Sequence, residues 1–149
     1  MAERGTLRTL IWVSLGIQLA GLVFEMFWHA LHAGFEAGTT REMVGHLSSV
    51  HLPIYFGVLC VLVMTALALI AESRRRDNEL ALPIAFVGAL ISAAGEAWHA
   101  STHMQLKTYG GPVAAAVSFF GFLVVVGALW LSRGRARGAA DKIDQRRAA

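Results

Sequence analysis

The sequence predicts an all-α integral membrane protein, an up-down bundle of four spanning helices with both termini in the cytoplasm. Hydrophobic residues make up 56% of the 149-residue chain and charged residues only 15%. The apolar residues fall in long blocks rather than in the rhythm of an amphipathic helix or strand. A hydrocarbon core of about 30 Å takes roughly 20 apolar residues per helix, so such blocks are long enough to cross it. The length of the chain leaves room for one domain.

Four segments have the required length, and they cover residues 7–33, 51–71, 80–103 and 112–131. The connections between them, GFEAGTTREMVGHLSSV, ESRRRDNE and MQLKTYGG, are richer in polar and turn-forming residues. We therefore expect residues 1–132 to form the bundle, with links short enough for antiparallel neighbours. Residues 133–149 are expected to form a basic, flexible cytoplasmic tail that is solvated and able to touch anionic lipid.

The basic residues predict the orientation, because Lys and Arg in short loops mark the cytoplasmic side of a membrane protein. One side of the four spans carries Arg4, Arg8, Arg74, Arg75, Arg76, Arg133, Arg135, Arg137, Lys142, Arg146 and Arg147. The other side carries only Arg41 and Lys107. The net charge of +3 is thus explained by the orientation of the chain in the membrane. We expect a multi-pass protein of the cell membrane, with the lipid bilayer and not nucleic acid as its partner. The single cysteine, Cys60, excludes an intrachain disulfide.

Ionisable residues gather at one depth, toward the expected external side. The first and third spans end in histidines, and two more lead into the second span; the six are His29, His32, His46, His51, His99 and His103. Residues three, four and seven apart share a helix face. The first span therefore carries a stripe of Glu25, His29 and His32. The third span carries a matching stripe of Glu96, His99 and His103.

The two stripes resemble each other in sequence, which suggests that the two halves of the chain are related. EMFWHALH (25–32) and EAWHASTH (96–103) share a glutamate, a Trp-His pair and a second histidine at an offset of about 70 residues. Although their spacings differ, they suggest two hairpins related about an axis along the membrane normal, with the stripes facing each other. The expected rungs are Glu25 with Glu96, His29 with His99, and His32 with His103.

Carboxylates and neutral imidazoles are ligands that zinc, copper and iron accept. A glutamate immersed near the hydrocarbon edge costs roughly 2–3 kcal/mol and normally has a partner. The sequence therefore predicts a mononuclear or dinuclear metal site at the external ends of the first three spans. Its candidate ligands are Glu25, His29, His32, His46, His51, Glu96, His99 and His103.

The predicted function is that of a membrane metalloprotein whose site faces the external side. The sequence leaves open whether it is an enzyme acting on a lipid-soluble substrate or a protein that stores, senses or delivers the metal. Oligomeric state and membership of a larger membrane complex are open as well. One alternative is an electron-transfer subunit in which His29 and His99 hold a single haem b. Another is a metal-free structural or proton-sensing subunit whose histidines titrate near neutral pH.

Overall fold

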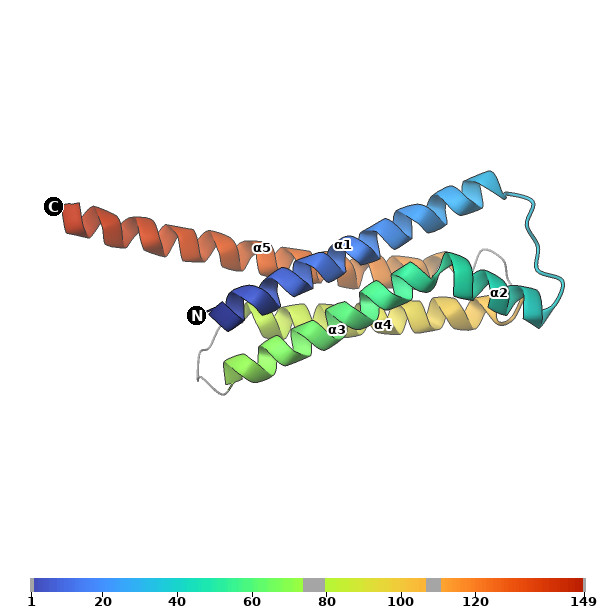
Figure 1. Cartoon of the computed structure of the whole chain (residues 1–149), viewed down its shortest axis with the longest axis horizontal. Coiled ribbons are helices and arrows are strands. Elements are labelled where there is room, and N and C mark those ends of the chain that lie inside the picture. The colour runs from blue at the N-terminus through green and yellow to red at the C-terminus, as the bar shows by residue number, and fades with distance from the viewer. Residues whose placement is uncertain (1, 74–79, 107–110, 149) are drawn as a thin grey trace.

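The computed structural model describes residues 2–73, 80–106 and 111–148, with side chains for 5–73, 80–106 and 111–133. Within these ranges the chain is all-α, which confirms the predicted class (Figure 1). The helices are α1 (Ala2–Leu31), α2 (Thr40–Val50), α3 (Leu52–Ser73), α4 (Ala81–His103) and α5 (Pro112–Ala148). Four segments are long and apolar enough to cross a membrane: Gly5–Leu31, Leu52–Ser73, Ala81–His103 and Pro112–Arg133. They pack together as the expected four-helix bundle.

The short helix α2 lies in the segment 34–50, which we expected to be a loop. The first turn of α2 is capped by two hydrogen bonds. The Thr39 hydroxyl accepts one from the Glu42 backbone N–H at 3.3 Å. The Glu42 carboxylate accepts the other from the Gly38 N–H at 2.9 Å. This is close to the capping-box arrangement, for which Thr-x-x-Glu is the sequence pattern. Helix α2 is only 11 residues long and has many polar residues. It therefore contains no long apolar block of the kind that predicted the other helices.

Two helix ends differ from the expected spans. Helix α1 ends at Leu31, so His32 lies beyond it. Helix α5 continues through the basic segment to Ala148, and Figure 1 shows this end projecting past the bundle on the side of the N-terminus. The flexibility and cytoplasmic place of the tail stay predictions. Arg74, Arg75, Arg76 and Lys107, which bear on the orientation, lie outside the described residues.

Helices α1 and α3 form one closely packed pair. A Cβ atom added to Gly21 would clash with the backbone of Ile54, and one added to Gly57 would clash with the backbone of Gln18. Small residues let helix backbones approach this closely, as is common between membrane-spanning helices. The contact fixes the register of α3 against α1.

Helices α4 and α5 form a second pair that is packed in the same way. Gly95 abuts the backbone of Ser118, and Gly121 abuts the backbone of Ser92. These residues repeat the first pair at fixed offsets: 74 residues separate Gly21 from Gly95 and Gln18 from Ser92, and 64 separate Ile54 from Ser118 and Gly57 from Gly121. The bundle is therefore built from two equivalent hairpins, as the sequence suggested.

The two pairs meet asymmetrically. Helices α3 and α4 pack against each other, whereas α1 and α5 have little close backbone contact within the described residues. Toward the chain termini, apolar side chains fill the centre of the bundle, including Ile11, Leu15, Val61, Val125 and Leu129. At the other end, where α1 and α4 finish and α3 and α5 begin, the centre is filled by histidines. We call this the histidine end.

The glycine contacts predict different effects on stability for two substitutions in α5. Gly121→Ala places a methyl group against the α4 backbone and should destabilise the bundle by about 1–3 kcal/mol. Gly127→Ala, on the same helix, meets nothing within 4 Å and should be neutral or slightly stabilising, since alanine favours helix. Thermal unfolding of the purified variants in detergent measures the difference. Equal midpoints for the two variants would mean that the close approach at Gly121 is not a structural constraint.

Candidate metal centre

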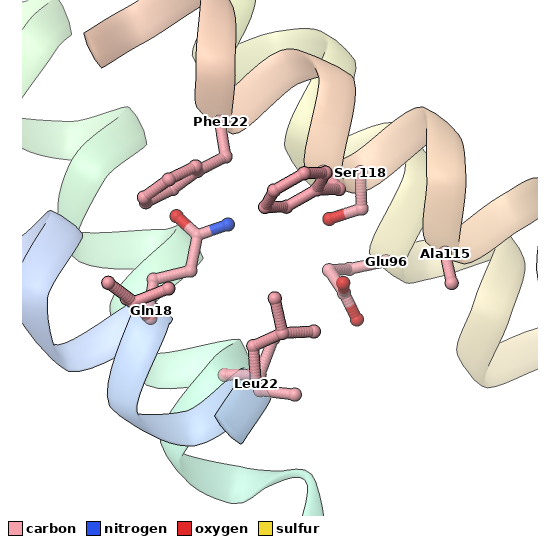
Figure 2. A pocket seen from close by; sticks show the side chains of 9 residues that line it. Gln18, Leu22, Glu96, Ala115, Ser118 and Phe122 are labelled. Carbon is pink, nitrogen blue, oxygen red and sulfur yellow. The ribbon is translucent and has the colours of Figure 1, made fainter. Parts of the chain in front are cut away.

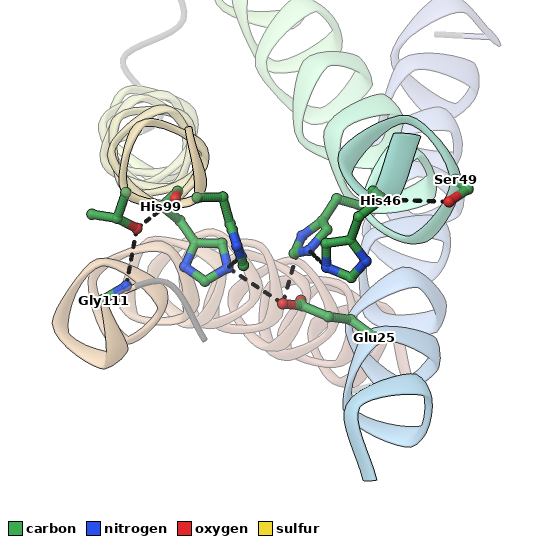
Figure 3. A network of polar contacts seen from close by, with 8 residues as sticks. Glu25, His46, Ser49, His99 and Gly111 are labelled. Carbon is green, nitrogen blue, oxygen red and sulfur yellow. Dashed lines mark hydrogen bonds and ion pairs between the residues drawn. The ribbon is translucent and has the colours of Figure 1, made fainter. Parts of the chain in front are cut away.

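Six donor side chains converge at the histidine end, and they come from three parts of the chain. Helix α1 supplies Glu25 and His29, and the last turns of α4 supply His99 and His103. The remaining two, His46 and His51, come from α2 and from the single residue that joins α2 to α3. Figure 3 shows the Glu25 carboxylate reaching from α1 into the space between the histidines of α4 and those of the α2 region.

The first group of donors consists of Glu25, His51, His99 and His103, whose ligand atoms all lie within 4.8 Å of one another. The Oε1 atom of Glu25 is 3.3 Å from His99 Nε2 and 3.5 Å from His51 Nδ1. His99 Nε2 is in turn 3.1 Å from His103 Nε2. Metal bonds of about 2.0–2.1 Å place the ligand atoms of a tetrahedral site about 3.3–3.4 Å apart. Three contacts among these four donors thus have the spacing expected in a tetrahedral ligand set.

The second group consists of His29, His46 and His51, again with ligand atoms within 4.8 Å of one another. His46 Nε2 lies 3.3 Å from His51 Nε2. The two ring nitrogens of His51 therefore face different groups, Nδ1 toward Glu25 and Nε2 toward His46. A histidine in this position is shared between two adjacent sets of donors.

Burial keeps two of these imidazoles neutral. It lowers the pKa of His51 to about 3, with the nearby His103 and His46 adding to the effect and Glu25 opposing it. Burial also lowers the pKa of His46, helped by the neighbouring His29. A low dielectric disfavours the charged ring. Because both rings are neutral near pH 7, each retains a lone pair that a metal ion can accept.

The hydrogen bonding within the cluster is incomplete. The Nδ1 atoms of His46, His99 and His103 are buried and have no hydrogen-bond partner, although buried polar groups normally have one. Close pairs of ring nitrogens, as in His99 and His103, also bring lone pairs together unless one nitrogen carries a proton. A cation at the convergence point would relieve this repulsion between lone pairs.

Backbone contacts hold the α4 ligands in place. The Thr102 hydroxyl donates to the carbonyl oxygen of His99 at 2.7 Å and accepts from the Gly111 N–H at 3.0 Å. This contact ties the start of α5 to the turn that carries His99 (Figure 3). The rings themselves are well enclosed, since His51 and His103 are 0% exposed and His46 and His99 are 4% exposed.

Aromatic side chains cover the cluster beside α2. The ring of Trp28 lies 4.5 Å from that of His46, and the ring of Phe35 lies 5.1 Å from it. Trp28 also stacks on the exposed His32, whose Nδ1 is 2.9 Å from the Trp28 carbonyl oxygen. His32 therefore lies over the outer face of this aromatic cover and outside both donor groups.

The expected rungs between α1 and α4 do not form, because the two helices are offset by 74 residues rather than about 70. Glu25 lies beside His99, and the rings of His29 and His103 stack at 6.4 Å. Glu96 falls about one turn deeper, beside Leu22. The hydrogen bond from Gln18 Nε2 to Ser92 Oγ, at 2.9 Å, joins α1 to α4 in this register.

Glu96 belongs to a separate polar group next to the cluster of donor side chains. Figure 2 shows its carboxylate near Ser118 and facing the space occupied by Gln18. These residues line a cavity of about 10 Å³, close to the smallest that can hold one water molecule. Glu96 Oε2 and Gln18 Oε1 are buried there without a hydrogen-bond partner. The Ser118 hydroxyl is also 3.3 Å from that of Ser92, so α5 contributes a polar side chain to this group.

The structure thus brings together Glu25, His29, His46, His51, His99 and His103, and it leaves His32 and Glu96 outside. The contribution of Phe35 to the aromatic cover was not anticipated. The Thr-x-x-Glu pattern at 39–42 was the available signal for the helix that presents His46.

Comparisons of the chain with protein-family models, with curated proteins and with solved structures find no match.

Proposed function

We propose that this protein is a membrane metalloprotein that binds zinc, copper or iron through Glu25, His29, His46, His51, His99 and His103. The observation that supports this most directly is the spacing of 3.1–3.5 Å among donors of the first group, which matches a tetrahedral ligand set. Glu25 is the acid among neutral bases. A carboxylate in an apolar environment needs a positive partner, and a divalent cation provides one to all four donors at once.

The centre has room for two ions, with His51 between them. One ion would take Glu25, His99, His103 and His51 Nδ1, and the other would take His29, His46 and His51 Nε2. A ring that has lost both N–H protons can ligate through both nitrogens, so His51 would act as the bridge. The second group has only three protein donors, which leaves a coordination position for water or another ligand, as in catalytic zinc sites.

The orientation belongs to the same proposal. The excess of Lys and Arg on the side of the termini and of the α3–α4 connection supports a cytoplasmic location for that side. The histidine end would then face the exterior of the cell membrane. From there the centre could acquire metal without passage through the bilayer.

A haem held by His29 and His99 fits the arrangement less well. The ring of His29 lies 5.2 Å from that of His46, 6.2 Å from that of His51 and 6.4 Å from that of His103. The Nε2 atom of His99 lies 3.3 Å from Glu25 Oε1 and 3.1 Å from His103 Nε2, which leaves no room for a macrocycle at that ring. In the metal-free alternative, a protonated His99 would pair with Glu25, and metal analysis decides between that arrangement and a metal centre.

Glu25 and Glu96 give a matched test of metal binding. Glu25→Gln removes a donor and its charge from the first group, so we expect metal affinity to fall by at least about tenfold, no less than the loss of an outer-shell partner causes. Glu96→Gln makes the same chemical change outside the cluster and should leave the affinity unchanged. Competition with a chromophoric chelator, combined with elemental analysis of the protein in detergent, measures both. Equal behaviour of the two variants would contradict the proposed ligand set.

The number of metal ions bound per chain tests whether the centre holds a second ion. The wild-type protein should bind two metal ions per chain, and His46→Ala should bind one, because two donors remain in the second group. His32→Ala, which removes an exposed histidine next to the cluster, should still bind two. A wild-type chain that saturates at one ion, with the same value for His46→Ala, would exclude the second ion.

A further inference from the structure

A cleft opens on the side of the bundle between α1 and α5, and it leads to the metal-ligand cluster. Its volume is about 560 Å³, within the range of small-molecule binding sites. From α1 it is lined by Leu22, Glu25, Met26 and His29, and from α5 by Ala115, Ala116 and Phe119. Glu25 belongs to the first donor group and His29 to the second, so both groups can be approached from the cleft.

The mouth of the cleft faces hydrocarbon. All of its lining residues lie within the segments Gly5–Leu31 and Pro112–Arg133, which are long and apolar enough to span a membrane. Its rim is apolar, with Met26 66% exposed and Phe119 42% exposed. A gap between two spanning helices at this depth is open to lipid chains.

The cleft results from the asymmetry of the two hairpins. The symmetry that exchanges α1 with α4 and α3 with α5 makes the α1–α5 seam equivalent to the α3–α4 seam. The α3–α4 seam is packed. The offset of 64 residues pairs Ala115 on α5 with His51, so a methyl group stands where the other hairpin has an imidazole ring. The small Ala115 and Ala116 leave one seam open.

Other routes to the donor atoms are covered within the described residues. Helix α2, Trp28 and Phe35 lie over the outer face of the cluster, and the rings of His46, His51, His99 and His103 are almost completely buried. Glu25 retains 14% of its side-chain exposure, and this carboxylate lines the cleft.

We propose that the cleft admits a membrane-dissolved amphiphile, with its hydrocarbon chain between α1 and α5 and a compact oxygen-bearing head group at the metal centre. This inference rests on the proposed metal-binding function and adds the class of molecule on which the centre acts. Apolar walls accommodate the chain, and Glu25 and His29 mark the inner end where the head group meets the metal. A water-soluble molecule without a hydrocarbon chain would gain nothing from these walls.

The experiment uses the cobalt-loaded full-length protein in phosphatidylcholine nanodiscs and two probes with the same chelating head, dodecyl hydroxamate and acetohydroxamate. Binding is read from the visible spectrum of cobalt. Ala116→Trp fills the cleft, so the half-saturating concentration of dodecyl hydroxamate should rise by at least about tenfold through steric exclusion. Metal content and the response to acetohydroxamate should stay unchanged. Ala94→Trp, the same change at an exposed position of α4 outside the cleft, should alter neither.

Equal effects of Ala116→Trp and Ala94→Trp on the dodecyl probe would overturn the inference. A loss of both probes in Ala116→Trp would overturn it as well, because that outcome means a shared aqueous path. A wild-type protein that takes up no cobalt would refute the proposed function itself.

A measurement that needs no metal tests the cleft separately from the proposed metal binding. A twelve-carbon fatty acid with a diazirine at its chain end should label the cleft residues of the metal-free protein, and Ala116→Trp should remove at least about nine-tenths of that labelling. Phosphatidylcholine with the same diazirine should label the cleft much less. Equal labelling by both probes would show that the cleft holds bulk bilayer lipid only and would overturn the proposal.

Discussion

The buried carboxylate of Glu25 is the feature on which the rest of the account depends. It lies in a membrane-spanning segment, within 3.5 Å of ring nitrogens from two other parts of the chain. A charge in such surroundings is costly unless it is paired. Neutral imidazoles satisfy it only in part, because each offers one N–H and directs a lone pair elsewhere. A metal ion satisfies the carboxylate and the lone pairs together, so one cation accounts for both the acid and the bases around it.

The helices can supply this convergence because four glycines bring backbones into contact. Gly21, Gly57, Gly95 and Gly121 each sit against the backbone of a partner helix, so neither hairpin can slide by a turn without a clash. Contacts between the hairpins, among them the hydrogen bond from Gln18 Nε2 to Ser92 Oγ, place Glu25 beside His99 rather than beside Glu96. Since metal ligands must be held to a fraction of an ångström, a ligand set at the end of such hairpins is better defined than one on loops.

Much of the fold follows from the sequence, because long apolar blocks have few alternatives in a bilayer. The ends of α3 and α4 lie within two residues of the expected spans, and the clustering of Glu25 with histidines follows from helical periodicity. The rung partners could not be obtained in the same way. Sequence similarity aligned Glu25 with Glu96, whereas the contacts between the two hairpins place it beside His99. Periodicity gives the face of each helix, but the register between helices depends on tertiary contacts.

The central claim is tested most directly by X-ray absorption at the metal edge of the zinc-loaded protein, which reports the number and type of atoms bound to the ion. The account predicts mainly imidazole nitrogen, with a minority of oxygen, at about 2.0–2.1 Å and with the outer-shell scattering typical of histidine rings. A spectrum without that outer-shell scattering, from a protein saturated with zinc, would contradict it. Bound zinc would then lie elsewhere on the chain, and the histidines around Glu25 would have another role.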